Sequence, residues 1–389
     1  MRKYSLFASI AFLLTLLAAI PVSAESESQP ANLAGNAESA ILMERDTGEI
    51  LFDKNAHEKL PPASMTKIMT MLIIMEELEA GTISLDETIR ISERAASMGG
   101  SQIFLEAGEE MSVEDLLKGI AVASGNDASV ALAERIAGSE EAFVERMNEK
   151  VEELGLENTK FQNSTGLPAE DHYSTSYDMA VIAKELLKYE SITDYTSIYE
   201  DYLRKGEENE FWLVNTNKLV RFYPGVDGLK TGYTNEAKYC LTATAKKDDM
   251  RIIAVVMGAE TPKERNAIIS GMLDYAYSQF ETKKLYEKDE VITTLQFTKA
   301  ENRQVNVVAS ESVSTIYKKG QAPEDVTNEV QIDKDLELPI KKGDKIGTMY
   351  VKNGEEIITE TPLTVDENVE HASYYTLLKR TLQEIAKAK

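Results

Sequence analysis

Two β-type segments at opposite ends of a long helical stretch constrain the fold of this sequence most strongly. Residues 40–55 (AILMERDTGEILFDKN) contain two short β-type runs joined at Asp46-Thr47-Gly48, which indicates a hairpin. A second pair of runs, residues 239–245 and 251–259, is joined by a charged turn. We therefore expect one antiparallel sheet built from both ends of this region, with helices packed on it, an α+β arrangement within the α/β class.

The residues between these segments have the apolar spacing of helices. The predicted helices span residues 65–78, 113–123, 127–136, 140–154 and 177–187, with one more over 262–280. From about residue 285 the pattern changes to short alternating runs separated by turn signals such as Lys319-Gly320 and Asn353-Gly354. We therefore predict a first domain over residues 25–283 and a small all-β domain over residues 284–372.

The N-terminus has the pattern of a secretory signal peptide. Arg2 and Lys3 precede an apolar run over residues 7–20, and small residues stand at positions 22 and 24. We expect cleavage after residue 24 and export of the protein from the cytoplasm. The apolar run is shorter than the roughly 20 residues of a membrane span, and an uncleaved anchor is the alternative.

The C-terminus, residues 373–389, predicts a basic amphipathic helix. Residues 376–389 carry four basic side chains and one acidic one. Their neighbouring apolar side chains fall on one helical face: Tyr375, Leu378, Leu382 and Ile385. Such a helix is a candidate anchor on a membrane surface, which would make the exported protein peripheral on the outer face of the cell membrane rather than fully secreted. The alternative is a helix that docks on its own domain.

Charge and composition exclude several classes of function. The 389 residues include 42 basic and 66 acidic side chains, a net charge of −24, which excludes a nucleic-acid binder with a broad basic footprint. One cysteine, Cys240, and three histidines cannot assemble a disulfide framework or a Cys/His metal cluster. We therefore expect chemistry without metal or cofactor, carried by Ser, Lys, Asp, Glu, Tyr or Arg. The oligomeric state stays open.

The segment Ser64-Met65-Thr66-Lys67 is the first candidate for that chemistry, and it precedes an apolar run over residues 68–75. On a helix, Ser64 and Lys67 would lie one turn apart on one face. A serine hydroxyl needs a neighbouring base to become a nucleophile, and a lysine with a lowered pKa can be that base. The alternative is a helix N-cap serine with a surface lysine.

Two further short motifs follow in the chain. Ser124-Gly125-Asn126 interrupts two predicted helices, and Lys230-Thr231-Gly232-Tyr233 leads into the strand that contains Cys240. Each has a simple structural explanation: the first as a helix end and a new N-cap, the second as a strand edge with a turn glycine. The functional interpretation is that both present polar groups to the cleft that holds Ser64.

In this order, S-x-x-K, S-x-N and K-T-G are the motifs of the penicillin-recognising serine acyltransferases. Residues 63–70 (ASMTKIMT), 119–127 (GIAVASGND) and 225–234 (GVDGLKTGYT) make the chain resemble the low-molecular-mass penicillin-binding proteins that are serine-type D-alanyl-D-alanine carboxypeptidases. The resemblance covers residues 36–280 and, more loosely, the rest of the chain. It is strongest to the sporulation-associated type of Gram-positive spore formers. It implies a penicillin-binding, β-lactamase-like transpeptidase fold followed by the all-β domain and the C-terminal helix.

The resemblance also implies roles for individual residues. Ser64 would attack the carbonyl between the two terminal D-alanines of a peptidoglycan pentapeptide, and Lys67 would accept its proton. Ser124, bridging toward Lys67 and Lys230, would pass a proton to the departing D-alanine. The backbone N–H groups of Ser64 and Tyr233 would form the oxyanion hole. Many relatives have His where Tyr233 stands, which leaves a side-chain contribution there in doubt.

Substrate binding falls to a second set of residues by the same resemblance. Asn126 would hydrogen-bond the peptide chain. Lys230 and Thr231, within a motif completed by Gly232, would bind the free carboxylate with help from Arg265, and Lys230 would keep Lys67 neutral. The expected ligands are peptidoglycan stem peptides and β-lactams.

Two alternative functions share these motifs. A serine β-lactamase of class A would carry an E-x-x-L-N segment, and none occurs between Asn126 and Lys230. A catalytically silent wall-binding protein would not need the complete motif set. We therefore predict a serine D-alanyl-D-alanine carboxypeptidase that forms a seryl ester and releases D-alanine.

Several residues near the motifs have structural interpretations instead. Thr175 and Asp178 predict a capping box. His172 is expected to be a packing or hydrogen-bonding residue and Cys240 a small apolar core residue. Trp212 is expected to be a core residue, and the alternative is that it flanks a cleft.

Overall fold

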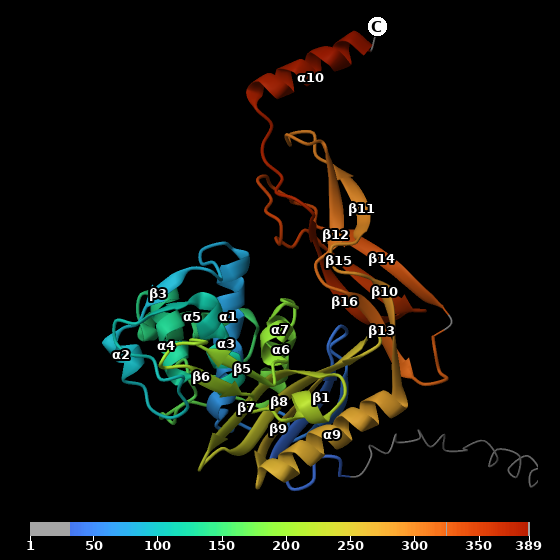
Figure 1. The fold of residues 1–389 in the computed structure, drawn as a ribbon. Coiled ribbons are helices and arrows are strands. Elements are labelled where there is room, and N and C mark those ends of the chain that lie inside the picture. The colour runs from blue at the N-terminus through green and yellow to red at the C-terminus, as the bar shows by residue number, and fades with distance from the viewer. Residues whose placement is uncertain (1–31, 324, 388–389) are drawn as a thin grey trace, which may run out of the picture. The chain divides into compact units, whose positions relative to one another are not determined.

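The computed structural model describes residues 32–323 and 325–387, so the predicted signal peptide lies outside the described residues. The first domain is built on a five-stranded antiparallel sheet with the order β2-β1-β9-β8-β7 (Figure 1). Its strands are β1 (Ser39–Glu44), β2 (Ile50–Lys54), β7 (Val226–Thr234), β8 (Lys238–Lys247) and β9 (Met250–Ala259). Strand β9 pairs with β1 in the centre of the sheet. The prediction of one sheet built from both ends of this region is therefore confirmed.

Helices occupy much of the chain between β2 and β7, and α9 follows β9. The apolar spacing predicted the longer ones, but not the three of four or five residues. The helices are α1 (Lys67–Glu79), α2 (Glu93–Ala96), α3 (Val113–Ala123), α4 (Asn126–Ala137), α5 (Glu140–Glu153), α6 (Ser176–Leu186), α7 (Ile192–Thr196), α8 (Leu219–Phe222) and α9 (Pro262–Gln279). A single 3-10 turn, η1 (Ala63–Thr66), precedes α1. Two short antiparallel pairs were not predicted from the sequence: β3 (Thr88–Arg90) with β4 (Glu110–Ser112), which has α2 between its strands, and the hairpin of β5 (Glu200–Leu203) and β6 (Phe211–Val214).

Both faces of the sheet are covered, because α6 packs on β1 and β9 while α9 packs on β8 and β9. Ile41 and Val255 are adjacent across β1 and β9 and share a core with α1. Every residue of α1 from Lys67 to Met75 is buried. A helix that is apolar all round belongs in a protein interior, so α1 is a rigid support for the turn that precedes it.

The predicted capping box at Thr175 forms in part. Thr175 Oγ1 accepts a hydrogen bond from the Asp178 backbone N–H at 3.0 Å, which is the N-cap bond. The Asp178 carboxylate accepts instead from Thr159 Oγ1 at 2.7 Å. Because the nearby Thr159 hydroxyl is buried and needs a partner, the reciprocal bond of the box is replaced by a tertiary one.

The second domain is all β, as predicted. A five-stranded sheet with the order β11-β12-β16-β15-β14 lies beside the β10-β13 pair, and its own core includes Val307, Met349 and Leu363. The strands are β10 (Phe280–Tyr286), β11 (Val291–Gln296), β12 (Gln304–Ala309), β13 (Val313–Lys318), β14 (Val326–Ile332), β15 (Gly347–Asn353) and β16 (Glu356–Val365).

A helix at the C-terminus, α10 (Tyr374–Lys387), presents its two faces differently. Its polar face contacts the all-β domain, because Arg380 donates to the Ala300 carbonyl at 2.7 Å and Glu384 pairs with Arg303 at 2.7 Å. The apolar side chains remain exposed: Tyr374, Tyr375, Leu378, Leu382 and Ile385. The helix therefore contacts its own domain, as the alternative predicts, but through its polar face and not through its apolar one.

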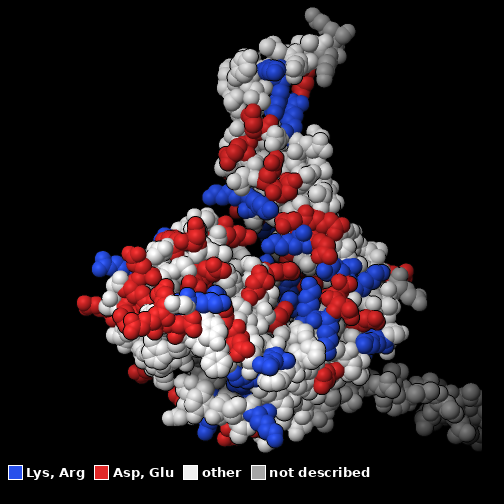
Figure 2. Space-filling view, viewed as in Figure 1, with Lys and Arg blue, Asp and Glu red and all other residues white. Residues whose placement is uncertain are grey.

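Acidic side chains gather over the region of α2, α4 and α5 on the face drawn in Figure 2. This distribution agrees with the net charge of −24. Among residues 32–323 and 325–387, no helix is both long and apolar enough to cross a bilayer.

Candidate active site

Ser64 lies in the 3-10 turn η1, and Lys67 is the first residue of α1. A 3-10 helix has three residues per turn, so side chains at positions i and i+3 align. Lys67 Nζ lies 3.2 Å from Ser64 Oγ. The structure therefore brings together the hydroxyl and the amine that the S-x-x-K spacing predicts to be neighbours.

The Lys67 amine has two closer partners, both of them acceptors. Nζ donates to Asn126 Oδ1 at 2.7 Å and to the Thr165 carbonyl at 2.7 Å. The Asn126 orientation is consistent, because its Nδ2 donates to the Gly99 carbonyl at 2.6 Å. A neutral amine has two hydrogens and one lone pair. The two acceptors use both hydrogens, which leaves the lone pair for the Ser64 hydroxyl.

The surroundings of Lys67 favour this neutral form. Burial lowers its pKa well below the ordinary lysine value, and the positive charge of Lys230 lowers it further, while Asp127 acts in the opposite direction. Lys230 is itself buried, and burial with the charge of Arg265 lowers its pKa to about 7. Burial lowers the pKa of Arg265 to about 10. The positive charge of Arg265 thus acts on Lys230, and that of Lys230 acts on Lys67.

The second motif forms the junction between α3 and α4. Ser124 ends α3 with a left-handed backbone (φ 66°), and Asn126 begins α4. The expected bridge from Ser124 to Lys67 and Lys230 is not formed, because the buried Ser124 Oγ has no hydrogen-bond partner among the described residues. A buried hydroxyl without a partner costs about 1–3 kcal/mol. This hydroxyl is therefore free to bond a bound molecule.

The third motif lies on β7, directly beside η1. Lys230 Nζ donates to the Thr231 carbonyl at 3.1 Å, and Thr231 Oγ1 donates to Thr216 Oγ1 at 2.8 Å. A Cβ on Gly232 would come within 2.7 Å of the Pro62 carbonyl oxygen. Only glycine lets β7 approach the serine turn this closely.

The two remaining predicted residues flank this strand. Half of the Tyr233 side chain is exposed, and its ring lies against Tyr239 with 4.5 Å between centroids. Arg265, on α9, is buried and donates to Asn266 Oδ1. Its charge acts on Lys230, as the lowered pKa of Lys230 shows.

Sequence reasoning missed several residues that hold the site in place. Thr165 supplies the carbonyl that accepts from Lys67, and a Cβ on Gly166 would come within 1.9 Å of the Ala63 carbonyl oxygen. Asn163 Oδ1 accepts from the backbone N–H groups of Thr165 and Gly166. This Asn-x-x-Gly turn is a recognisable signal, but its proximity to Ser64 is a tertiary fact.

Asp127 was also missed as a positioning residue. Its carboxylate accepts from the backbone N–H groups of Ile103 and Leu105 and so holds the loop over the second motif. Asp127 forms no ion pair with Lys67 among the described residues, although its charge still raises the pKa of Lys67.

Two of the structural interpretations near the motifs are confirmed. The Gln162 backbone N–H donates to His172 Nδ1, so the neutral ring carries its hydrogen on Nε2 and donates to Thr66 Oγ1 at 2.8 Å. Burial lowers the pKa of His172 to about 4, which keeps it neutral. Cys240 is buried.

The interpretation of Trp212 as a core residue is wrong. Its side chain is 55% exposed and is paired across the β5-β6 hairpin with Tyr202. Alternation along β6 places Leu213 in the core, so the adjacent Trp212 points to the opposite face.

Comparison with known proteins identifies the fold and the activity. The family model described as D-alanyl-D-alanine carboxypeptidase matches residues 23–261, more than half of the chain, and the model described as penicillin-binding protein 5, C-terminal domain, matches residues 280–371. The chain belongs to the D-alanyl-D-alanine carboxypeptidase family. It is 56% identical to D-alanyl-D-alanine carboxypeptidase DacF of Bacillus subtilis over 357 residues, 92% of each chain.

More distant members of the carboxypeptidase family agree. D-alanyl-D-alanine carboxypeptidase DacC of Escherichia coli is 36% identical over 351 residues, 87% of this chain and 86% of the relative. The solved structure of penicillin-binding protein 5 from Haemophilus influenzae is similar with a TM-score of 0.68 and 32% identity, over 88% of this chain and 99% of that one.

The protein is therefore a D-alanyl-D-alanine carboxypeptidase with the fold of the penicillin-binding proteins. The predicted penicillin-binding fold with a following all-β domain is confirmed. The two alternative functions, a serine β-lactamase and a catalytically silent wall-binding protein, are therefore rejected.

Proposed function

We propose that Ser64 is the nucleophile of this carboxypeptidase and that Lys67 is its general base. One observation carries the proposal: the amine of Lys67 has two acceptors at 2.7 Å and the Ser64 hydroxyl at 3.2 Å. With both hydrogens of a neutral amine engaged, its lone pair meets the Ser64 O–H. This is the arrangement in which an amine takes a proton from a hydroxyl.

Acylation then proceeds with a balanced transfer of one proton. Ser64 Oγ bonds to the carbonyl carbon between the two D-alanines while its proton passes to Lys67. When the C–N bond breaks, the proton reaches the departing amine through Ser124, whose buried hydroxyl has no other partner among the described residues. Water later attacks the ester carbonyl while Lys67 takes the water proton, and this proton passes to Ser64 Oγ when the ester C–O bond breaks.

Substrate selection rests on the terminal carboxylate. Lys230, Thr231 and Arg265 form its binding site in this proposal, because two buried cations at one place suit an anion. The backbone N–H groups of Ser64 and Tyr233 stabilise the oxyanion, and Asn126 holds the peptide. β-Lactams enter the same site; penicillin-binding protein D2 of Listeria monocytogenes, with a TM-score of 0.56 and 28% identity over 62% of this chain, has been solved in an ampicillin-bound form.

Mass spectrometry tests this assignment. The purified protein is incubated with a pentapeptide that ends in two D-alanines, and we expect the loss of one alanine. A fluorescent penicillin should label the peptide that contains Ser64. Ser64→Ala should abolish both signals, and an unchanged release rate in this variant would refute the mechanism.

We further propose that residues 1–24 are a signal peptide, that residues 25–283 form the catalytic domain and residues 284–372 the accessory β domain, and that the enzyme works outside the cytoplasm. The exposed apolar face of α10 supports a peripheral position on the outer face of the membrane. N-terminal sequencing of the protein recovered from culture tests cleavage after residue 24, and an intact N-terminus would contradict it.

A role in sporulation is the last part of the proposal. It is supported by the resemblance of the motifs to the sporulation-associated type and by the 56% identity to the Bacillus subtilis relative. Deleting the gene should change the peptide composition of spore peptidoglycan and leave that of growing cells as it is. The reverse pattern would contradict this role.

A further inference from the structure

Glu140, the first residue of α5, is buried, and no step of the proposed mechanism uses it. Its Oε1 accepts two hydrogen bonds from Ser164, one from the backbone N–H at 3.3 Å and one from Oγ at 3.0 Å. Its Oε2 pairs with Arg94 at 2.8 Å, and the Arg94 side chain is 56% exposed. Glutamates are almost never buried without partners. Here the buried partner of the carboxylate is a single residue of one loop segment.

Ser164 lies immediately before the residue that binds the proposed base. The Thr165 carbonyl accepts from Lys67 Nζ at 2.7 Å. The Ser164 carbonyl accepts from Thr70 Oγ1 at 2.7 Å, and Thr70 lies one turn after Lys67 on α1. Both carbonyls are therefore bonded to α1, while the N–H and the hydroxyl of Ser164 are bonded to Glu140. The segment is held between α1 and α5 by these hydrogen bonds.

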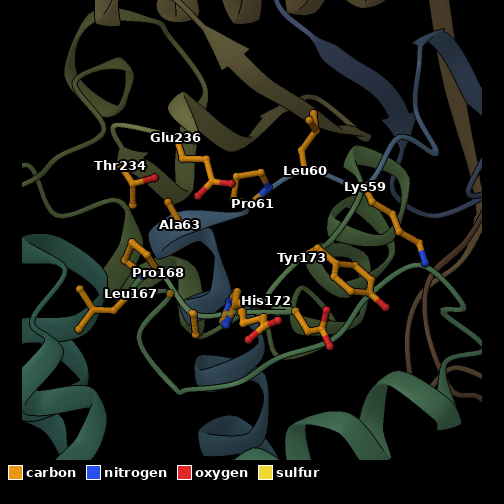
Figure 3. Close-up of a pocket in the computed structure, with 14 residues that line it drawn as sticks. Lys59, Leu60, Pro61, Ala63, Leu167, Pro168, His172, Tyr173, Thr234 and Glu236 are labelled. Atoms are coloured by element: carbon orange, nitrogen blue, oxygen red, sulfur yellow. The ribbon is translucent and has the colours of Figure 1, made fainter.

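Packing restrains the end of this segment less, because a cavity lies beside it. Gly166 and Ala63 both line this cavity of about 620 Å³ next to the serine turn (Figure 3). A cavity supplies few atoms for the segment to pack against. The bonds of Asn163 Oδ1 stay within the segment and fix its shape rather than its position. The position therefore depends on the hydrogen bonds from Thr70 and to Glu140.

We infer that Glu140 is a positioning residue for the general base. By holding Ser164, it keeps the Thr165 carbonyl within 2.7 Å of Lys67 Nζ. That carbonyl takes one hydrogen of the neutral amine, so the lone pair stays directed at Ser64 Oγ, 3.2 Å away. The inference rests on the proposed role of Lys67.

The effect of Glu140 is geometric rather than electrostatic. The charges that act on the pKa of Lys67 are those of Lys230 and Asp127. The charge of Glu140 is matched by Arg94. An uncharged side chain of the same length that still accepts from Ser164 should therefore do the same work, and glutamine is such a side chain.

Kinetics of D-alanine release test the inference. Glu140→Ala would leave the N–H and the hydroxyl of Ser164 buried without a partner, which favours movement of the segment. We expect kcat on a pentapeptide that ends in two D-alanines to fall roughly 10- to 100-fold, since a displacement of about 1 Å costs up to about 10² in rate. KM should change less than about threefold, because the groups that bind the substrate are untouched.

Three variants separate this role from a general loss of structure. Glu140→Gln keeps the acceptor for Ser164 and should restore kcat to within about threefold of the wild-type value. Arg94→Ala removes the ion pair but keeps both bonds to Ser164, and Glu141→Ala removes the adjacent exposed carboxylate. Both should keep the wild-type kcat. Thermal unfolding checks the fold of each variant, and titration with a fluorescent penicillin gives the concentration of active sites.

A double-mutant cycle tests the route through Ser164. Ser164→Ala removes one of the two bonds to Glu140 and should lower kcat in the same direction. Added to Glu140→Ala, it should have little further effect, because that bond is already lost. Additive losses would show that Glu140 acts by another route.

Two further results would overturn the inference: a wild-type kcat in Glu140→Ala, or a loss of kcat that Glu140→Gln does not restore. Near-normal release by Lys67→Ala would instead refute the proposed function. The two failures are distinguishable, because the first concerns variants at position 140 in an enzyme that still depends on Lys67.

Discussion

The basicity of Lys67 depends on its surroundings, in which no described carboxylate forms an ion pair with its amine. The side chain is fully buried, and the carboxylate whose charge acts on it, that of Asp127, accepts from backbone N–H groups and forms no ion pair with it among the described residues. A direct ion pair would have kept the amine charged. Burial and the charge of Lys230 instead lower its pKa, so the neutral form that a base requires is the favoured one.

Lys67→Ala should therefore slow acylation by penicillin roughly 10²- to 10⁴-fold while the protein stays folded. Stopped-flow fluorescence measures the rate, and circular dichroism checks the fold. Lys263→Ala, an exposed lysine on α9, is the matched control and should acylate normally. Near-normal acylation of Lys67→Ala would exclude Lys67 as the base.

The charge of Lys230 makes a prediction about pH. Lys67 acts as a base only after losing its proton, so the acylation rate rises as the pH passes upward through the pKa of Lys67. Lys230 lowers that pKa. Removing the charge by Lys230→Gln should raise it, and the rising limb of the pH profile should move to higher pH.

Lys230→Gln should also weaken carboxylate binding and so lower the overall rate. This loss does not change the pH at which the rate rises. A limb that stays in place would show that Lys230 has no electrostatic effect on Lys67. Lys263→Ala again serves as the control, because it should leave the limb unmoved.

At the scale of elements, Gly166 and Gly232 allow three backbone segments to pack closely together. The η1 turn is approached by β7 at Gly232 and by the loop at Gly166, and a Cβ at either position would collide with backbone. The nucleophile is thus aligned by close main-chain packing as well as by its own helix. Such alignment is sensitive, because a displacement of about 1 Å costs roughly 10²-fold in rate.

Gly232→Ala should lower the acylation rate on the order of 10²-fold, because the new Cβ would lie 2.7 Å from the Pro62 carbonyl oxygen and would push β7 away from η1. The rate of penicillin labelling measures this. Gly271→Ala on α9 has no atom within 4 Å of the new Cβ. It should acylate normally and be more stable by about 1 kcal/mol. Equal labelling rates in the two variants would contradict the steric argument.

At the scale of the whole molecule, α10 divides its surface between the protein and the solvent. Its polar face contacts the β domain through Arg380 and Glu384. Its apolar face is exposed. A large exposed apolar patch on a protein surface indicates a site that contacts a partner.

Deleting residues 376–389 should abolish co-sedimentation with anionic lipid vesicles, because both the apolar face and the basic charge are removed. The double variant Leu378→Ser, Leu382→Ser should weaken binding strongly, whereas Glu384→Gln on the polar face should retain it. D-Alanine release should persist in all three. Undiminished sedimentation of the deletion variant would rule out the anchor.

Much of this architecture is predictable because it depends on local patterns. Alternating and helical periodicity predicted β1, β2, β8 and β9 of the central sheet, the main helices and the all-β character of the second domain, but not β7. The three motifs predicted which side chains gather at the site. The short β3-β4 pair and the β5-β6 hairpin were not predicted, because three or four residues are too few to show a period. The burial of Trp212 was predicted wrongly for a related reason, since a large aromatic residue alone does not reveal which face of a hairpin is buried.

The sequence by itself determined which residues carry the chemistry, because their order and spacing are properties of the chain. Only the tertiary structure decided their protonation and alignment. The pKa of Lys67 depends on burial and on a cation 163 positions away in the chain, at Lys230. The acceptors at Asn126 and Thr165, and the close approach at Gly166, likewise come from distant segments. Electrostatic and packing energies depend on distances in space, which periodicity and motif spacing do not record.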